Sequence, residues 1–573
     1  MISDNELSGM PFCLSDEEVA WVRRTLCGMS TEDRLRQLFC LVVYEDDEEY
    51  CRYIGQHVRP GGYMSRPMSL ESSLAAARRM QKYSKIPLLV AANLEAGGNG
   101  AVSEGTRLGS PMEIAATGDI EFARRLGEVC GVEGGAAGIS WAFAPIADID
   151  YNWRNPITNT RTFGSDPHRV AELCTEYIKE VQRRGLAASA KHFPGDGRDE
   201  RDQHVAVSVN DMSCEEWDGS YGRVYSACIA AGVKTIMVGH ILQPAYTRRL
   251  CPGIKDGEIL PASVSYPLVT GLLRERLDFR GLVVTDSSTM AGVAVFLPRE
   301  RLVPMAIAAG CDMFLFTRSL EEDLEYMRRG YEDGIITPER LSDAVTRILA
   351  LKASLGLPER AAAGRLVPDI NEARERVGKA QFCEWARECA ERAITLVKEE
   401  PGVLPLTPER YPRVLFYPLE NKSSGATVFN VDASENRRFS EALRREGFRV
   451  TVFEPSRGFE GMMTPVREFT EKYDLIIYSA AIQTRSNQTT VRIEWAPPMG
   501  VDVPTLTHTI PTVFVSLENP YHMIDVPHVR TFINCYSGSE EVIGALMEKL
   551  TGRDGFLGVS PSDVFVGRWS GKE

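Results

Sequence analysis

The sequence predicts an α/β protein in which a (β/α)8 TIM-type barrel is followed by a smaller α/β/α sandwich domain. Eight short, nearly continuously apolar segments alternate with helical segments in the first part of the chain, as expected for parallel strands buried on both faces. Polar residues lie at the C-terminal ends of these segments, the ends that converge on one face of such a barrel and form its substrate site. The six residues are Asn93, Asp148, Lys191, His192, His240 and Asp286.

The barrel elements are expected in the following order. Residues 14–36 are predicted to be helical, with Ser15 as a helix cap and Ser30 to Asp33 resembling a capping box. The strand candidates are 38–43, 61–64, 87–93, 142–149, 186–192, 235–240, 282–286 and 313–317. Intervening helices are expected over segments that include 167–184, 213–231, 262–277 and 320–353.

We expect three parts: a barrel over residues 1–355, a polar linker over 356–390 and a sandwich domain over 391–573. The third part alternates again between apolar and helical segments, as in an open parallel sheet. It has no Gly-x-Gly-x-x-Gly after its first strand, so it is not predicted to bind a nucleotide. Its strand candidates are 394–398, 414–417, 450–453, 475–479, 513–516 and 532–534, and helices are expected over 436–446 and 539–551.

Composition excludes several classes of function. The chain has 573 residues, 43% hydrophobic and 25% charged, and these fractions are typical of a globular protein. Its net charge of −14 argues against a nucleic-acid or anionic-membrane surface, which needs clustered cations. No apolar stretch is long enough for a membrane span, and the first residues do not resemble a secretory signal.

The cysteines predict a reducing environment. All thirteen are scattered, and no two form a Cys-x-x-Cys pair. This pattern is typical of packed, reduced thiols, so we expect a cytoplasmic protein without a zinc site or disulfide framework.

Asp286 is the first candidate for chemistry. A carboxylate at the end of a barrel strand can attack an electrophilic carbon or stabilise a developing cation. Alternatively, an aspartate before a helical segment is a favoured helix cap. The residue pattern alone leaves both interpretations open.

Asp202 and His204 form the second candidate. A carboxylate two residues from a histidine can bond the ring, fix its tautomer and make it a general acid or base. The alternative is a chance pairing in a solvated, charged loop. A calcium loop is excluded, because the acidic positions 196, 199 and 202 lack the alternate-residue ligand spacing.

Lys191, His192 and Arg161 are candidate ligand-binding residues. Adjacent strand residues point to opposite faces, so Lys191 and His192 can reach one ligand only if the strand ends or bulges there. Arg161 follows a loop rich in Asn and Pro, and its guanidinium could bond the hydroxyls of a polyol. A structural histidine and a surface ion pair are the alternatives.

These motifs, taken in order, resemble glycoside hydrolase family 3, and within it the β-N-acetylglucosaminidase branch. Lys191-His192-Phe193-Pro194-Gly195 is the most specific motif, together with the Asp202-x-His204 pair. The resemblance also covers the second domain. The other matching segments are 87–98, 143–148, 161–164, 285–286, 308–312, 394–398 and 404–406.

The resemblance implies a retaining hydrolase that removes terminal β-linked N-acetylglucosamine, or N-acetylhexosamine, from oligosaccharides or glycoconjugates. Asp286 would attack the anomeric carbon, and His204, oriented by Asp202, would be the general acid/base. The implied partner is a carbohydrate, no metal or cofactor is needed, and the chain would be a monomer or homodimer. The implied sugar-binding residues are Asn93, Asp148, Arg161, Lys191, His192 and His240.

Three departures from the family pattern leave specificity open. Asn93 stands where the family commonly has Asp, with an extra residue in the turn that follows, and Asp196 stands where the branch often has His. The loop over 198–201 is also unusually charged. The alternatives are a β-N-acetylglucosaminide phosphorylase, in which phosphate intercepts the glycosyl-enzyme, and a β-glucosidase of the same family. An alternative from another class is a non-catalytic sugar-binding protein.

Overall fold

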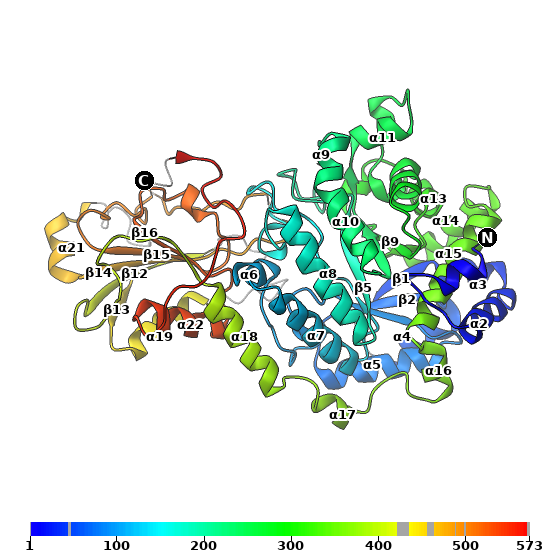
Figure 1. Ribbon diagram of the computed structural model, residues 1–573, viewed down its shortest axis with the longest axis horizontal. Coiled ribbons are helices and arrows are strands. Elements are labelled where there is room, and N and C mark those ends of the chain that lie inside the picture. The colour runs from blue at the N-terminus through cyan, green and yellow to red at the C-terminus, as the bar shows by residue number, and fades with distance from the viewer. Residues whose placement is uncertain are drawn as a thin grey trace. The chain divides into compact units, whose positions relative to one another are not determined.

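The computed structural model describes residues 2–43, 47–420, 435–454, 463–487, 489–497 and 500–569. Contacts divide the chain into two compact units (Figure 1). The barrel unit comprises Met1–Leu108, Ala123–Asn152 and Asp166–Cys383, and the sheet unit comprises Gly109–Phe122, Trp153–Ser165 and Glu384–Glu573. This division differs from the contiguous domains expected from the sequence, because two short segments from the first half of the chain fold with the sheet unit.

The barrel unit contains a closed sheet of eight parallel strands in the order β1-β10-β9-β7-β5-β4-β3-β2, which confirms the predicted TIM-type barrel. Its eight strands correspond in order to the eight predicted segments. They are β1 (Phe39–Val43), β2 (Gly62–Ser65), β3 (Leu89–Ala92), β4 (Trp141–Ala142), β5 (Ala187–Phe193), β7 (Thr235–Val238), β9 (Leu282–Ser287) and β10 (Met313–Leu315). A separate parallel pair joins β6 (Ser208–Val209) to β8 (Ile241–Leu242).

Strand β4 is shorter than predicted, because the chain leaves regular pairing after Ala142. Pro145 lies in the predicted remainder and has no N–H to donate to a neighbouring strand. Beyond it, the Ala147 N–H donates to the Lys191 carbonyl, 2.7 Å away. The segment therefore continues beside the end of β5 and brings Asp148 to that point.

Helices fill the connections of the barrel unit. The first predicted helical region is two helices: Ser15 and Glu18 form a full capping box on α2, and the Ser30 side chain caps α3. The α-helices are α1 (Asp4–Ser8), α2 (Asp16–Cys27), α3 (Thr31–Gln37), α4 (Glu48–Tyr53), α5 (Leu70–Tyr83), α7 (Glu121–Ala136), α8 (Pro167–Arg183), α9 (Cys214–Gly219), α10 (Tyr221–Ala230), α11 (Pro244–Leu250), α12 (Ala291–Ala294), α13 (Arg299–Ala309), α14 (Leu320–Glu332) and α15 (Pro338–Ser354). The segment predicted over 262–277 is a 3-10 turn, Ala262–Val264, followed by a π-helix, Pro267–Arg276.

The expected linker, 356–390, carries helical structure of its own. It contains α16 (Leu357–Ala362), α17 (Ile370–Arg374) and most of α18 (Ala380–Ala393). Ala373 on α17 is fully buried, so this segment packs against the barrel rather than only connecting two domains.

The sheet unit is built on six strands in the order β11-β16-β15-β14-β12-β13. All neighbours are parallel except β11 and β16, which pair antiparallel, so the predicted open parallel sheet has one antiparallel edge strand. The strands are β11 (Thr395–Lys398), β12 (Arg413–Glu420), β13 (Arg449–Val452), β14 (Leu475–Ala481), β15 (Thr512–Ser516) and β16 (Thr531–Asn534), and the helices are α6 (Pro111–Ala116), α19 (Glu435–Arg445), α21 (Val466–Lys472) and α22 (Glu540–Leu550).

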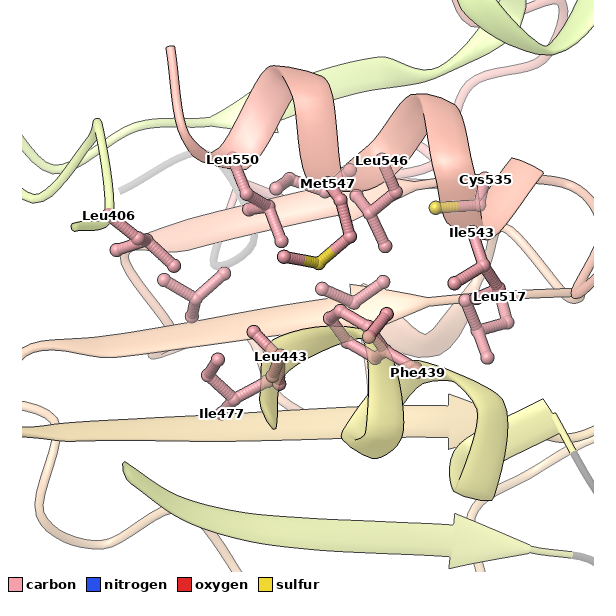
Figure 2. Close-up of a cluster of buried hydrophobic side chains, with 14 of the residues drawn as sticks. Leu406, Phe439, Leu443, Ile477, Leu517, Cys535, Ile543, Leu546, Met547 and Leu550 are labelled. Atoms are coloured by element: carbon pink, nitrogen blue, oxygen red, sulfur yellow. The ribbon is translucent and has the colours of Figure 1, made fainter. Parts of the chain in front are cut away.

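Alternate side chains of this sheet enter two separate cores, as the two-residue repeat of a strand requires. Ile477 of β14 faces α19 and α22, which cover it with residues such as Phe439, Leu443 and Leu546 (Figure 2). Its neighbour Ile476 belongs to the opposite core. Helix α21 and irregular segments cover that opposite face.

Asp312 pairs with a group of arginines within the barrel unit. It is fully buried and precedes β10. Its carboxylate accepts a hydrogen bond from the Val283 N–H at 2.9 Å and ion pairs from Arg274 at 2.6 Å and Arg340. Burial opposes its ionisation, but the arginines lower the pKa of Asp312 below its ordinary value. Burial, in turn, lowers the pKa of Arg274 to about 9.

Among the residues that the structure describes, no helix combines the length and apolar character needed to cross a bilayer.

We predict that Asp312→Ala destabilises the barrel unit by about 3–5 kcal/mol, because it leaves buried guanidinium groups without their counter-charge. Urea unfolding of the full chain measures this loss. The matched control is Asp4→Ala, which removes an exposed ion pair with Arg23 and should cost about 1 kcal/mol or less. Because the pKa of Asp312 is lowered in the fold, its contribution should persist above pH ~4 and disappear as pH falls through the folded value. Equal losses for the two variants would contradict this role.

Candidate active site

The C-terminal ends of the barrel strands bring most of the predicted residues to one end of the barrel. Asp286 is the next-to-last residue of β9, and Lys191 and His192 lie near the end of β5. Both strands are labelled in Figure 1. The β5–β7 register shifts between Ala190 and Phe193, which is the irregularity that the sequence required at this pair. The site is therefore assembled from residues that are up to about two hundred positions apart in the chain.

Asp148 organises the end of β5. Its side chain is 1% exposed. One oxygen, Oδ1, accepts hydrogen bonds from the His192 N–H at 3.0 Å and the Asp196 N–H at 2.8 Å. The other, Oδ2, is 2.7 Å from the Nδ1 of the His192 ring. Asp148 is therefore occupied by groups of the protein itself, and its contact with Nδ1 orients the His192 ring.

His192 connects Asp148 to Asp286. The 2.7 Å contact between Asp148 and Nδ1 fixes the orientation of the His192 ring. The opposite nitrogen, Nε2, lies 3.8 Å from Oδ2 of Asp286. The imidazole is thus held beside the candidate nucleophile.

Three imidazoles keep the Asp286 carboxyl ionised. Burial favours the neutral acid, but His192, His240 and His204 interact with the charge and lower the pKa of Asp286 below its ordinary value. Its side chain retains 13% exposure, so one face stays accessible. An ionised, accessible carboxylate is suited to nucleophilic attack.

Asp202 and His204 make the contact that their spacing predicts. Asp202 is fully buried on its side chain, and its Oδ1 accepts from the His204 N–H at 2.9 Å and lies 2.7 Å from the ring Nδ1. The contact to Nδ1 makes Nε2 the ring atom through which His204 can exchange a proton. The His204 side chain is 30% exposed, far more than the side chains of the other site histidines.

Gln203, which the sequence did not single out, holds this loop in place. Its Oε1 accepts from the His240 N–H at 2.7 Å, and its Nε2 donates to Asp196 at 3.0 Å. The loop backbone also accepts from Ala291 and Gly292, which follow β9. The dyad is therefore attached to the strand that carries Asp286.

Lys191 pairs with Glu95, the second residue that the sequence did not single out. Its Nζ lies 2.8 Å from Glu95 Oε1 and 3.3 Å from Asn93 Oδ1, and its side chain is 3% exposed. Glu95 lies two residues after Asn93, just beyond the end of β3. A carboxylate this close to the end of a barrel strand is the sequence signal that could have identified Glu95.

His240 and Arg161 have positions that differ from those of the other predicted residues. Both ring nitrogens of His240 are engaged, Nδ1 with Ser263 at 2.7 Å and Nε2 with the Ser287 carbonyl at 2.8 Å. Burial lowers the pKa of His240 below its ordinary value, and the nearby charge of Asp286 opposes this shift. His240 therefore supports the Asp286–Ser287 backbone rather than presenting a nitrogen to a ligand. Arg161 lies in the sheet unit, where its Nη1 donates to the Ile157 carbonyl at 3.0 Å.

Across the described residues, His, Cys, Asp and Glu side chains form no group of three or more with the arrangement of a metal site. The site residues are instead arranged as carboxylate–imidazole pairs. Such pairs can supply a nucleophile and a proton donor at the same carbon.

Comparison with known proteins identifies a family model, a curated relative and solved structures to which this chain is similar. The sequence profile described as "Glycosyl hydrolase family 3 N terminal domain" matches residues 41–351. A "Beta-N-acetylglucosaminidase/beta-glucosidase" from Cellulomonas fimi is 54% identical over 98% of this chain and 99% of its own. The solved structure "Beta-glucoside phosphorylase BglX" has a TM-score of 0.92 and 41% identity, with 100% of both chains covered. A family 3 β-N-acetylglucosaminidase from Paenibacillus sp. str. FPU-7 shares the fold, with a TM-score of 0.77, 24% identity and coverage of 94% of this chain and 100% of its own.

We predict that diethyl pyrocarbonate acylates His204 faster than His192 or His240, because reagent access follows the exposure of the ring. Peptide mass mapping after brief treatment measures the order of modification. His168, which is exposed on α8, serves as a reactive reference, and the buried His522 as an unreactive one. Modification of His240 before His204 would contradict the geometry.

Proposed function

This chain belongs to glycoside hydrolase family 3, and we propose that it removes terminal β-linked N-acetylglucosamine, or N-acetylhexosamine, with retention of configuration. The observation that carries the proposal is the pairing of an ionised Asp286 with an Asp202–His204 dyad whose loop is hydrogen-bonded to the segment that follows β9. The printed name of the Cellulomonas fimi relative includes this sugar specificity.

Asp286 is the proposed nucleophile. Its carboxylate forms a bond to the anomeric carbon while the bond from that carbon to the leaving oxygen breaks, which gives a covalent glycosyl-enzyme. The three surrounding imidazoles favour the charged form that attack requires. The carboxylate at the C-terminal end of β9 can therefore attack without first losing a proton.

His204 is the proposed general acid/base. In the first step its Nε2 proton passes to the leaving oxygen, and in the second the neutral ring takes a proton from the attacking acceptor. Asp202 holds Nδ1 and stabilises the charged ring. A histidine differs from the carboxylate that is usual in glycosidases because its base form is neutral.

Sugar positioning is proposed for Lys191, with Glu95 and Asn93, and for the exposed edge of His192. Lys191 and Glu95 form a rigid ion pair whose remaining donors and acceptors can bond adjacent hydroxyls. Asp148 and His240 are proposed to act by positioning His192 and Ser287. Arg161 stays a predicted sugar ligand.

Phosphorolysis is a second candidate activity. The observation that favours it is the full-length likeness to the protein described as "Beta-glucoside phosphorylase BglX". The neutral base form of His204 is compatible with it, because a neutral imidazole does not repel an anionic acceptor as a carboxylate would. The same glycosyl-enzyme would then be intercepted by phosphate instead of water.

We predict that Asp286→Asn lowers turnover of β-N-acetylglucosaminides by about 10⁴-fold or more without a loss of melting temperature. His204→Gln should slow an N-acetylglucosamine disaccharide by about 10²- to 10⁴-fold, yet slow aryl glycosides with good leaving groups much less, because those leave without protonation. Steady-state kinetics on both substrate classes measure this difference. His168→Gln, an exposed histidine on α8, is the matched control. Wild-type rates in both variants would refute the assignment.

We predict that aryl β-glycosides of GlcNAc, among a panel that also contains GalNAc, Glc and Xyl, are cleaved with the highest kcat/KM. Each assay is run with and without inorganic phosphate, and products are separated by chromatography. Free sugar as the main product in both conditions supports hydrolysis. A sugar 1-phosphate as the main product would replace hydrolysis by phosphorolysis, and a preference for Glc would replace the proposed sugar.

A further inference from the structure

The barrel unit has a cleft at the end opposite Asp286. It is an open cleft of about 970 Å³ lined by Leu186, which precedes β5, and Ile139, which precedes β4. Strand β5 separates Leu186 from His192 by six residues, or about 20 Å of extended chain. Residues 355–379, here called the strap, form the other wall. The cleft is therefore distinct from the candidate active site.

The charge of this cleft is opposite to that of the protein. The whole chain carries a net charge of −14, yet six basic and only two acidic residues line the cleft. A concave surface that gathers one sign of charge concentrates the field there. The basic residues are Arg78, Arg184, Arg360, Arg365, Arg376 and Lys379, and the acidic ones are Asp369 and Glu372.

Half of these cations stabilise the walls. Arg184 forms ion pairs with Glu128 and Glu180 on the helices behind it. Arg78 donates to the Pro368 carbonyl at 2.7 Å, and Arg360 donates to the Leu366 carbonyl at 3.0 Å. These bonds hold the strap against α5 and close its own loop.

The strap is also anchored at its far end. The Gly378 N–H donates to Oε1 of Glu133 at 2.9 Å, and Glu133 is fully buried on α7. This contact fixes the backbone between Arg376 and Lys379. The cations on the strap are therefore carried by a backbone that is held in place before any ligand arrives.

Arg365 and Arg376 have no carboxylate partner in the part of the chain that the structure describes. Both lie exposed on the strap and line the cleft. Unneutralised guanidinium groups that share a cleft repel one another, and an anion that binds between them removes this repulsion. A guanidinium presents paired N–H donors that match the oxygens of phosphate groups.

We propose that this cleft binds a small anion that carries two or more phosphate groups. The volume lies within the range of small-molecule sites, and several cations line both walls of the cleft, more than one phosphate group needs. The ligand would contact Arg365 and Arg376 from the strap, with Lys379 and Arg78 near its ends.

Isothermal titration calorimetry of tripolyphosphate into the full chain tests the proposal. We expect binding of one molecule that weakens as NaCl is raised, because salt screens the exposed cations. The double variant Arg365→Glu/Arg376→Glu should bind at least ~10-fold more weakly, since two attractive contacts become repulsive. Arg365→Lys/Arg376→Lys should retain most of the affinity.

Arg374→Glu is the matched control, because Arg374 lies on the same segment, pairs with Glu71 at 3.7 Å and does not line the cleft. Wild-type-like affinity in this variant, with loss in the double variant, supports the site. The proposal is overturned if the wild-type chain does not bind tripolyphosphate at low salt, or if the double variant, with an unchanged circular dichroism spectrum, binds as tightly as the wild type. Binding to anionic lipid vesicles without binding to tripolyphosphate would also overturn it.

Discussion

The Asp148 carboxylate accepts hydrogen bonds at the point where β5 ends, and the geometry of the candidate active site depends on it. By bonding the backbone of His192 and Asp196 it sets the exit of the chain from the strand, and by bonding the ring Nδ1 it directs the imidazole toward Asp286. The exit in turn leads to Gln203, which joins the loop to His240. A buried carboxylate with three donors is a strong local constraint, because moving any partner would leave it unsatisfied.

The electrostatics of the site follow from this arrangement. Asp286 lies among imidazoles, whose charge interactions lower its pKa and favour the negative form that the proposed attack needs. The proton-transfer group is also an imidazole, whose charge alternates between positive and neutral. In the proposed reaction, an anionic acceptor such as phosphate meets a neutral imidazole rather than a second carboxylate at the proton-transfer position.

The sheet unit has the same alternation of strands and helices as the barrel unit, but it forms a different kind of sheet. Both units are made of short apolar strands alternating with helices, but one sheet closes on itself and the other stays open with an antiparallel edge. The open sheet buries both faces, so its strands are as apolar as those of the barrel. Strand hydrophobicity alone therefore cannot distinguish a closed sheet from an open one. The eight strand candidates before the linking segment are what predicted a closed barrel.

The sequence by itself determined the element order, the eight barrel strands, the position of polar residues at strand ends and the Asp202–His204 contact, because each depends on local spacing or on strand periodicity. It did not determine where β4 ends or that 109–122 and 153–165 fold with the sheet unit. Nor could it reveal that Asp148 and His240 are occupied by protein partners, while Glu95 pairs with Lys191. Those features are contacts between residues far apart in the chain, and only the tertiary structure decides which donor reaches which acceptor.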